Sequence, residues 1–140
     1  MDCLDLRIAP PRPGRAELGS VVFLPRSIDK ARAMLPGGSL GEYRMEGFTE
    51  DMLERLGISA DDFISTVRDA SSDEEVAAYV AQRNGASAIA AWNDYVVHRK
   101  PFGDDRAAAV ARFPFLAERP DLVYALDVLE EDDRLTFAGR

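Results

Sequence analysis

Apolar side chains recur every three or four positions over most of the chain, the spacing that places them on one face of an α-helix. Clear examples are Met52 and Leu56 in one segment and Phe63 and Val67 in the next. This pattern predicts helices over residues 28–35, 50–57, 60–70, 73–84, 88–100, 104–113 and 121–133. The expected N-caps are Ser27, Thr49, Ser59, Ser72 and Ser87, with Ser72 and Glu75 forming a capping box.

The first segments of the chain lack such a stripe. Residues 1–15 contain three prolines and a glycine, which favours an extended arm over a helix or a central strand. Residues 16–24 are ambiguous. We favour a short helix that ends before Pro25, although residues 21–24 also suit a short strand.

The predicted elements together define a fold class. Residues 39–48 are predicted to form a loop, and residues 134–137 could form a strand against residues 42–46. Short connections between the predicted helices favour direct packing of neighbours. We therefore expect an all-α fold: an irregular multi-helix bundle with an extended N-terminal arm and at most a minor two-stranded ribbon. A length of 140 residues fits a single domain over residues 1–140, with residues 1–15 as its arm.

Composition excludes several classes of protein. One cysteine and one histidine leave no internal disulfide, zinc finger or iron–sulfur site, so neither a metal nor another cofactor is expected. No apolar run approaches the ~18 residues of a membrane span. The acidic, proline-rich start is unlike a secretory signal peptide, and we expect a cytoplasmic protein without membrane contact.

Charge limits the possible partners. A net charge of −8 argues against nucleic acid, because phosphate backbones select for clustered positive charge. The charge is uneven: residues 1–48 hold seven basic and six acidic residues, whereas residues 49–140 hold ten and 19. An anionic ligand would therefore be repelled least in the first third of the chain. The acidic run at residues 130–133 is interpreted as a solvated helix end.

The densest group of candidate functional residues lies within residues 24–43. Arg26 and Lys30 are four residues apart, which places them on one helix face, and a glycine-rich turn that could expose N–H groups to an anion follows. Alternatively, this turn only ends the helix, and Asp29 pairs with an arginine. No nucleotide-binding glycine fingerprint is present. The candidate anion-binding residues are Arg7, Arg26, Asp29, Lys30, Arg32, Gly37, Gly38, Gly41 and Tyr43.

Trp92 and Asn93 form a secondary candidate site. The alternative places Trp92 in the core and gives Asn93 the role of capping another segment's backbone. His98 lies near a predicted helix end, where a protonated imidazole is favourable, and is a weaker candidate for a general base. No serine, cysteine or lysine stands in a context that identifies it as a nucleophile.

The block LPRSIDKARAMLPGGSLGEY at residues 24–43, with Leu4-Asp5-Leu6-Arg7 and Trp92-Asn93, resembles a family of small bacterial proteins known only as a domain of unknown function. The resemblance extends over most of the chain, and the pattern LPR-x-IDKARA, LPG and LGEY is its specific part. It implies a compact, mostly helical bacterial cytoplasmic domain, and it implies no activity.

Three functions remain open. The first is a non-enzymatic binding or regulatory domain for a small anionic metabolite or a protein partner, using the cations and glycine turn of the candidate site. The second is a small-molecule enzyme with Asp29 or His98 as a base beside those cations, which requires a pocket. The third is a self-associating structural or interaction protein, a homo-oligomer in which Phe48, Phe102 and Phe113 would form an exposed patch.

Overall fold

Helices make up most of the chain in the computed structural model, which describes residues 1–139. Within that range the all-α prediction is confirmed, since the sheet structure consists of one short hairpin with strands β1 (Glu17–Leu18) and β2 (Val21–Val22). The helices are α1 (Leu24–Ala33), α2 (Phe48–Arg55), α3 (Ala60–Asp69), α4 (Asp73–Arg83), α5 (Ala86–Val97), α6 (Arg106–Arg112), the 3-10 helix η1 (Pro114–Glu118) and α7 (Ala125–Phe137).

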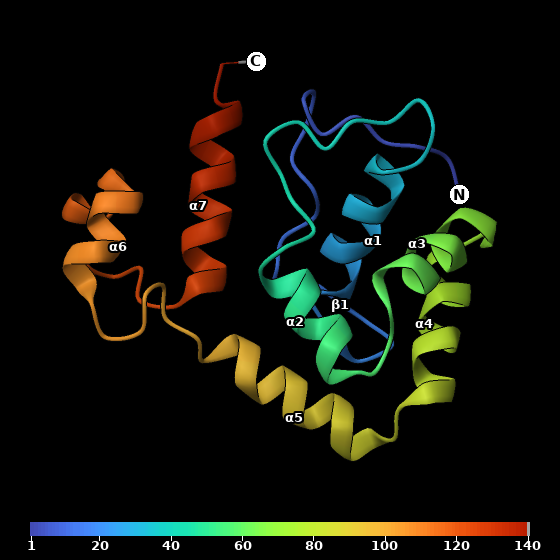
Figure 1. Cartoon of the computed structure of the whole chain (residues 1–140). Coiled ribbons are helices and arrows are strands. Elements are labelled where there is room, and N and C mark those ends of the chain that lie inside the picture. Colours follow the sequence, from blue (N-terminus) through green and yellow to red (C-terminus); the bar gives the residue numbers. More distant parts are fainter. Residues whose placement is uncertain (140) are drawn as a thin grey trace.

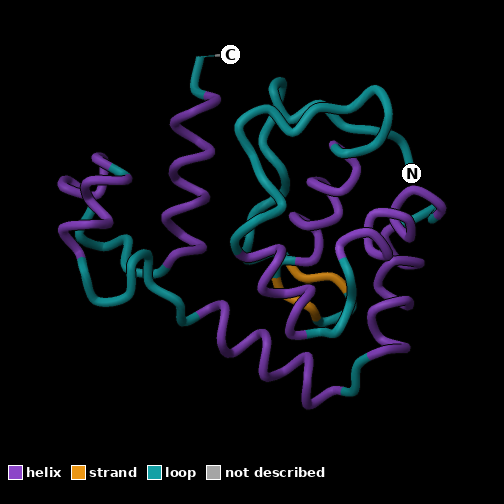
Figure 2. Tube along the Cα trace, in the orientation of Figure 1, coloured by secondary structure: helices purple, strands orange, loops and turns teal. Residues whose placement is uncertain are grey.

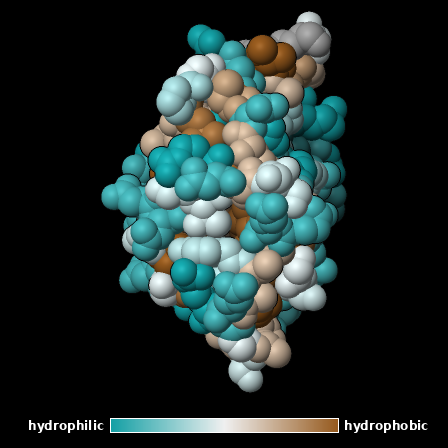
Figure 3. All heavy atoms as spheres, turned by 90° about the vertical axis from the view of Figure 1, so that its right-hand side faces the viewer, coloured by the Kyte–Doolittle hydropathy of each residue, from teal (hydrophilic) through white to brown (hydrophobic). Residues whose placement is uncertain are grey.

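Helix α1 lies at the centre of the larger part of the molecule (Figure 1). It contacts β1, α3 and α4, while α5 runs along the bottom of the view and contacts β2, α2 and α7. The main hydrophobic core lies between these elements and includes Leu24, Ile28, Phe63 and Trp92, all buried. Polar side chains cover most of the face seen in Figure 3, between smaller apolar patches. In the described part of the chain, no helix has both the length and the apolar character needed to cross a membrane.

A second, smaller core joins α6, η1 and α7. It contains Ala109, Phe113, Leu116 and Val128, which come from these three elements. Helix α7 takes part in both cores, because its Leu126 belongs to the main one. In Figure 1, α7 accordingly stands between α6 and the elements around α1.

Helix α7 begins later and ends later than predicted. The predicted start near residue 121 is wrong because Arg106 holds the preceding turn: its guanidinium donates to the carbonyl oxygens of Leu122 and Arg119 at 2.7 and 2.9 Å. The predicted strand over residues 134–137 is also wrong, since these residues form the last turn of α7.

Residues 17–22 form the β hairpin, and the short helix favoured over residues 16–24 from the sequence is wrong. Gly19 and Ser20 both have positive φ, 54° and 64°, the backbone of a tight two-residue hairpin turn. Asn93 on α5 holds this hairpin (orange in Figure 2) in place. Its Oδ1 accepts from the Val22 N–H at 3.0 Å, and its Nδ2 donates to the Ser20 carbonyl at 2.7 Å.

Helix α1 begins at Leu24, earlier than predicted. Its N-cap is Phe23, whose φ of 76° is a left-handed conformation that strains a bulky residue. Pro25 occupies the first turn, where its missing N–H costs nothing. Ser27 therefore lies inside the helix, and its hydroxyl is 2.9 Å from that of Thr49, both residues being buried. These two residues join α1 to α2 and cap neither helix.

Of the other three predicted N-caps, two are confirmed and one is wrong. Ser59 and Ser72 are confirmed, because each side chain accepts a backbone hydrogen bond from the first turn of its helix. The cap at Ser87 is wrong, because α5 begins at Ala86 with Gly85 as its N-cap.

The N-terminal arm is free of helix and lies against the segment that follows α1. Ser39 donates to the Leu4 carbonyl at 3.0 Å and accepts from the Leu6 N–H at 2.9 Å. Leu6 is buried, whereas Ile8 is 74% exposed, so the arm is anchored at Leu6.

We expect Asn93→Ala to lower the free energy of unfolding by about 1–3 kcal/mol, because both hairpin hydrogen bonds are lost. Asn93→Asp keeps the acceptor for Val22 but places a second acceptor against the Ser20 carbonyl, so it should be destabilised as well. Urea unfolding measures both variants. An unchanged midpoint for Asn93→Ala would show that Asn93 does not hold the hairpin.

Candidate functional site

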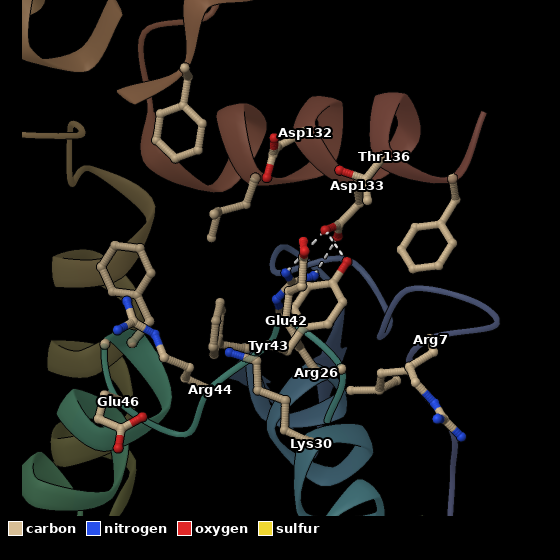
Figure 4. A pocket seen from close by; sticks show the side chains of 18 of the residues that line it. Arg7, Arg26, Lys30, Glu42, Tyr43, Arg44, Glu46, Asp132, Asp133 and Thr136 are labelled. Atoms are coloured by element: carbon tan, nitrogen blue, oxygen red, sulfur yellow. Dashed lines mark hydrogen bonds and ion pairs between the residues drawn. The ribbon is translucent and has the colours of Figure 1, made fainter. Parts of the chain in front are cut away.

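A pocket of about 470 Å³ opens between α1, the loop that precedes α2, and α7 (Figure 4). Its lining combines aromatic and aliphatic side chains with charged ones of both signs. The lining residues are Leu6, Arg7, Phe23, Arg26, Lys30, Gly41, Glu42, Tyr43, Arg44, Glu46, Gly47, Phe48, Arg112, Phe113, Leu129, Asp132, Asp133, Thr136 and Phe137. This volume falls in the usual range for small-molecule sites.

Helical spacing brings the polar groups of the pocket together. Arg26 and Lys30 lie one turn apart on α1 and therefore share a face. Asp132, Asp133 and Thr136 come from the end of α7, on the opposite side of the pocket in Figure 4.

A buried ion pair closes the pocket between α1 and α7. The Arg26 guanidinium, only 2% exposed, lies 2.7 Å through Nη1 from Oδ2 of Asp133. Tyr43 donates its hydroxyl to Oδ1 of the same carboxylate at 2.6 Å. Burial, followed by this hydrogen bond and the negative charge of Asp133, raises the Tyr43 pKa, so the phenol stays a donor over the physiological pH range. Arg26 is thus committed to an internal partner and is not available to hold an anion.

Lys30 is the unusual cation of the pocket. It is 7% exposed, and its ammonium lies 5.6 Å from the Phe23 ring centroid. Its ammonium forms no ion pair or hydrogen bond with any residue in the range 1–139. Burial, and then repulsion from Arg26, lower the Lys30 pKa to about 8. Near neutral pH the side chain therefore carries a proton but releases it readily.

Asp132 faces the pocket from α7 (Figure 4). It is half-buried and forms no ion pair or hydrogen bond with the residues described. Burial, and then the adjacent charge of Asp133, raise the Asp132 pKa, while Arg112 and Arg26 oppose that shift.

Aromatic rings form the apolar walls. Phe23 and Phe48 meet edge to face with ring centroids 5.7 Å apart, and Phe113 and Phe137 line other parts of the pocket. Leu129 of α7 adds an aliphatic surface. These walls would contact an apolar ligand body closely.

Arg7 and Gly41, two other candidate residues, line the pocket but interact with neighbouring residues of the chain. Arg7 is exposed and pairs with Asp5 at 2.8 Å. Gly41 has φ of 58°, and a Cβ there would lie 3.2 Å from Cγ of Arg7. Its N–H donates to the Ser39 hydroxyl and is not free for an anion.

The remaining candidates of residues 24–43 lie outside the pocket lining. Arg32 donates to the Asp2 carbonyl at 2.7 Å. Asp29 accepts from the Arg12 guanidinium and backbone N–H, the internal arginine pairing foreseen as an alternative. Gly37 and Gly38 lie in the turn after α1, whose C-cap is Met34, and form no part of the pocket.

The other proposed sites are also separate from the pocket. Trp92 is buried and donates to the Val22 carbonyl at 2.8 Å, while Asn93 holds the hairpin, so both take the structural alternative. His98 is exposed beside Asp94 and, like Asp29, does not line the pocket, so neither is placed as a base there. Phe102 is 54% exposed but does not join Phe48 and Phe113, which line the pocket.

The sequence analysis missed the contribution of α7. Residues 130–133 were expected to be a solvated end, yet Asp133 is buried. A signal was available: Asp133 follows Leu129 by four residues and therefore shares its inward face. Arg44 and Arg112 had no comparable signal, because they reach the pocket from a loop and from α6.

The family model described as "Domain of unknown function (DUF5069)" matches residues 8–135. No curated protein matches the chain.

We expect Asp133→Ala to destabilise the fold by about 3–5 kcal/mol, because it leaves the Arg26 charge buried and uncompensated. The double variant Arg26→Met, Asp133→Leu should recover much of this loss, since it removes both charges. Chemical unfolding of the three chains measures the effect. If Asp133→Ala alone matches the native stability, the pair is not what joins α1 to α7.

The pKa of Lys30 predicts a pH-dependent stability. Between about pH 8 and 10.5 the unfolded chain keeps the proton that the folded chain has released, so the free energy of unfolding should rise with pH. The full effect is on the order of 3 kcal/mol. Lys30→Met lacks this pH-dependent contribution. The difference in unfolding free energy between the native chain and the variant therefore separates the effect of Lys30 from that of other titrating groups. Parallel stability curves for the two chains would contradict the assigned pKa.

Proposed function

The chain belongs to the DUF5069 family, whose description assigns no activity, and we propose that its function is to bind a small organic anion in the pocket between α1 and α7. One observation carries this proposal: Lys30 presents a nearly buried ammonium to the pocket, and this ammonium forms no ion pair or hydrogen bond with residues 1–139. A buried charge without a partner is costly, and a ligand carboxylate or phosphate would offset that cost.

The other charges of the pocket support an anion at Lys30. Arg44 and Arg112 are exposed and form no ion pair with the described residues, and Glu42 and Glu46 are exposed as well. Solvent screens these four rim charges, whereas the buried Lys30 acts through a low dielectric. Of the pocket charges that form no ion pair with the described residues, Lys30 is the most deeply buried, and the half-buried Asp132 opposes it.

The shape of the site defines the rest of the ligand. A pocket of about 470 Å³ with walls of Phe48, Phe113 and Leu129 suits an aromatic or branched aliphatic body. The ligand class is thus an amphipathic anion, with its charge at Lys30 and its apolar part against these walls.

We expect benzoate, phenylacetate and phenyl phosphate to bind more tightly than the neutral benzamide and phenylacetamide, and to raise the melting temperature. Lys30→Met should weaken anion binding at least about tenfold, and the native chain should bind more weakly at pH 9.5 than at pH 7 because Lys30 deprotonates.

The matched control is Lys100→Met, which removes the only other lysine, an exposed one beside Asp104. Calorimetry measures affinity in all three chains. Equal affinity for acids and amides, or full binding by Lys30→Met, would overturn the proposal.

We further propose a bacterial source and a cytoplasmic location. The resemblance of residues 24–43 to small bacterial proteins supports the source. The single exposed Cys3 supports a reducing compartment.

A further inference from the structure

We propose that Lys30 reacts as a primary amine with a carbonyl compound, so that the ligand of this pocket is an organic anion bearing an aldehyde or a 2-oxo group, held as an imine. This inference rests on the proposed function, because it assigns the reactive group of the same ligand. Its physical basis is the nearly buried Lys30 side chain, which lines the same pocket as the apolar walls.

The setting of Lys30 favours nucleophilic chemistry. An amine attacks a carbonyl carbon only when it is unprotonated and unpaired, and burial in an apolar pocket promotes both conditions. Lys30 is 7% exposed, and its nitrogen forms no ion pair or hydrogen bond with the described residues. Its nitrogen lies 5.6 Å from the centroid of the Phe23 ring, part of the apolar wall. No sequence motif announces this role, because it arises from packing.

The charged groups around Lys30 keep the unprotonated amine accessible near neutral pH. On its own helix Arg26 repels the ammonium form, and Arg44 does so from the loop before α2. Asp133 on α7 and Glu46 on the loop oppose them. Burial together with the two cations outweighs the acids, so the pKa falls to about 8 and a useful fraction of free amine exists at pH 7.5.

The step balances without any further reactant. The Lys30 nitrogen forms a bond to the carbonyl carbon, the C=O π electrons move to oxygen, and a proton passes from nitrogen to that oxygen. A proton from solvent converts the hydroxyl to water, which leaves while the nitrogen lone pair forms the C=N bond. The nitrogen proton returns to solvent, so one carbonyl and one amine give one imine and one water.

The test uses phenylpyruvate, which has a 2-oxo group, and 3-phenylpropionate, which lacks it. The full-length protein is incubated with each compound and sodium cyanoborohydride, which reduces an imine to a stable secondary amine. Mass spectrometry and peptide mapping then locate the adduct. We expect labelling by phenylpyruvate at Lys30 to exceed that at Lys100 at least about tenfold, with no adduct from 3-phenylpropionate.

The variants separate chemistry from folding. Lys30→Arg keeps a cation and should lose the adduct, while Lys100→Met should retain it. The labelling rate of the native chain should rise from pH 6 to pH 8.5 as the amine loses its proton.

The outcomes distinguish this inference from the proposed function. Binding of 3-phenylpropionate without a Lys30 adduct from phenylpyruvate would overturn the imine and leave anion binding intact. Equal labelling of Lys30 and Lys100 would also overturn it, since ordinary surface amines would then react as well. If neither compound binds or reacts, both proposals fail.

Discussion

The buried ion pair between Arg26 and Asp133 is the interaction on which the candidate site depends. It joins the first helix to the last across the pocket, and Tyr43 brings the intervening loop to the same carboxylate. A buried pair of this kind adds direction more than net stability, because desolvation consumes much of its Coulomb energy. Lys30 lies one turn from Arg26, so the cation that fixes the fold also repels the proton on the neighbouring amine. Arg26 therefore contributes both to the packing of α1 on α7 and to the lowered pKa of Lys30, for which burial is the larger cause.

Local sequence was sufficient for much of the fold. Ser59 and Ser72 cap their helices as predicted, because a cap depends on residues within one turn. The hairpin at residues 17–22 was not predictable in this way, since it is held by Asn93, about 70 residues further along the chain. The start of α1 was missed for a related reason: only the packed structure maintains the positive φ of Phe23.

The candidate site was predictable on α1 and unpredictable elsewhere. Arg26 and Lys30 both reach the pocket because four residues return to the same helix face, whereas Arg32, two positions beyond Lys30, lies on the other side. The glycines suggested an anion-binding turn, but close packing of the backbone explains the glycine at position 38. A Cβ there would lie 2.7 Å from the Ala33 carbonyl oxygen and 2.8 Å from that of Leu4 in the arm. The carboxylates of α7 depend on how distant segments pack, which helical spacing alone does not reveal.

Helix α7 has three packing roles within thirteen residues. Leu126 belongs to the main core, Val128 to the smaller core with α6 and η1, and Asp133 to the pocket. The helix that forms one wall of the pocket thus also packs against α6 and η1. The distance between α1 and α7 is therefore set partly by residues of the smaller core, outside the pocket. A ligand that widened this gap would displace α7 toward α6. Binding in the pocket would then change the packing of α6 on the far side of α7.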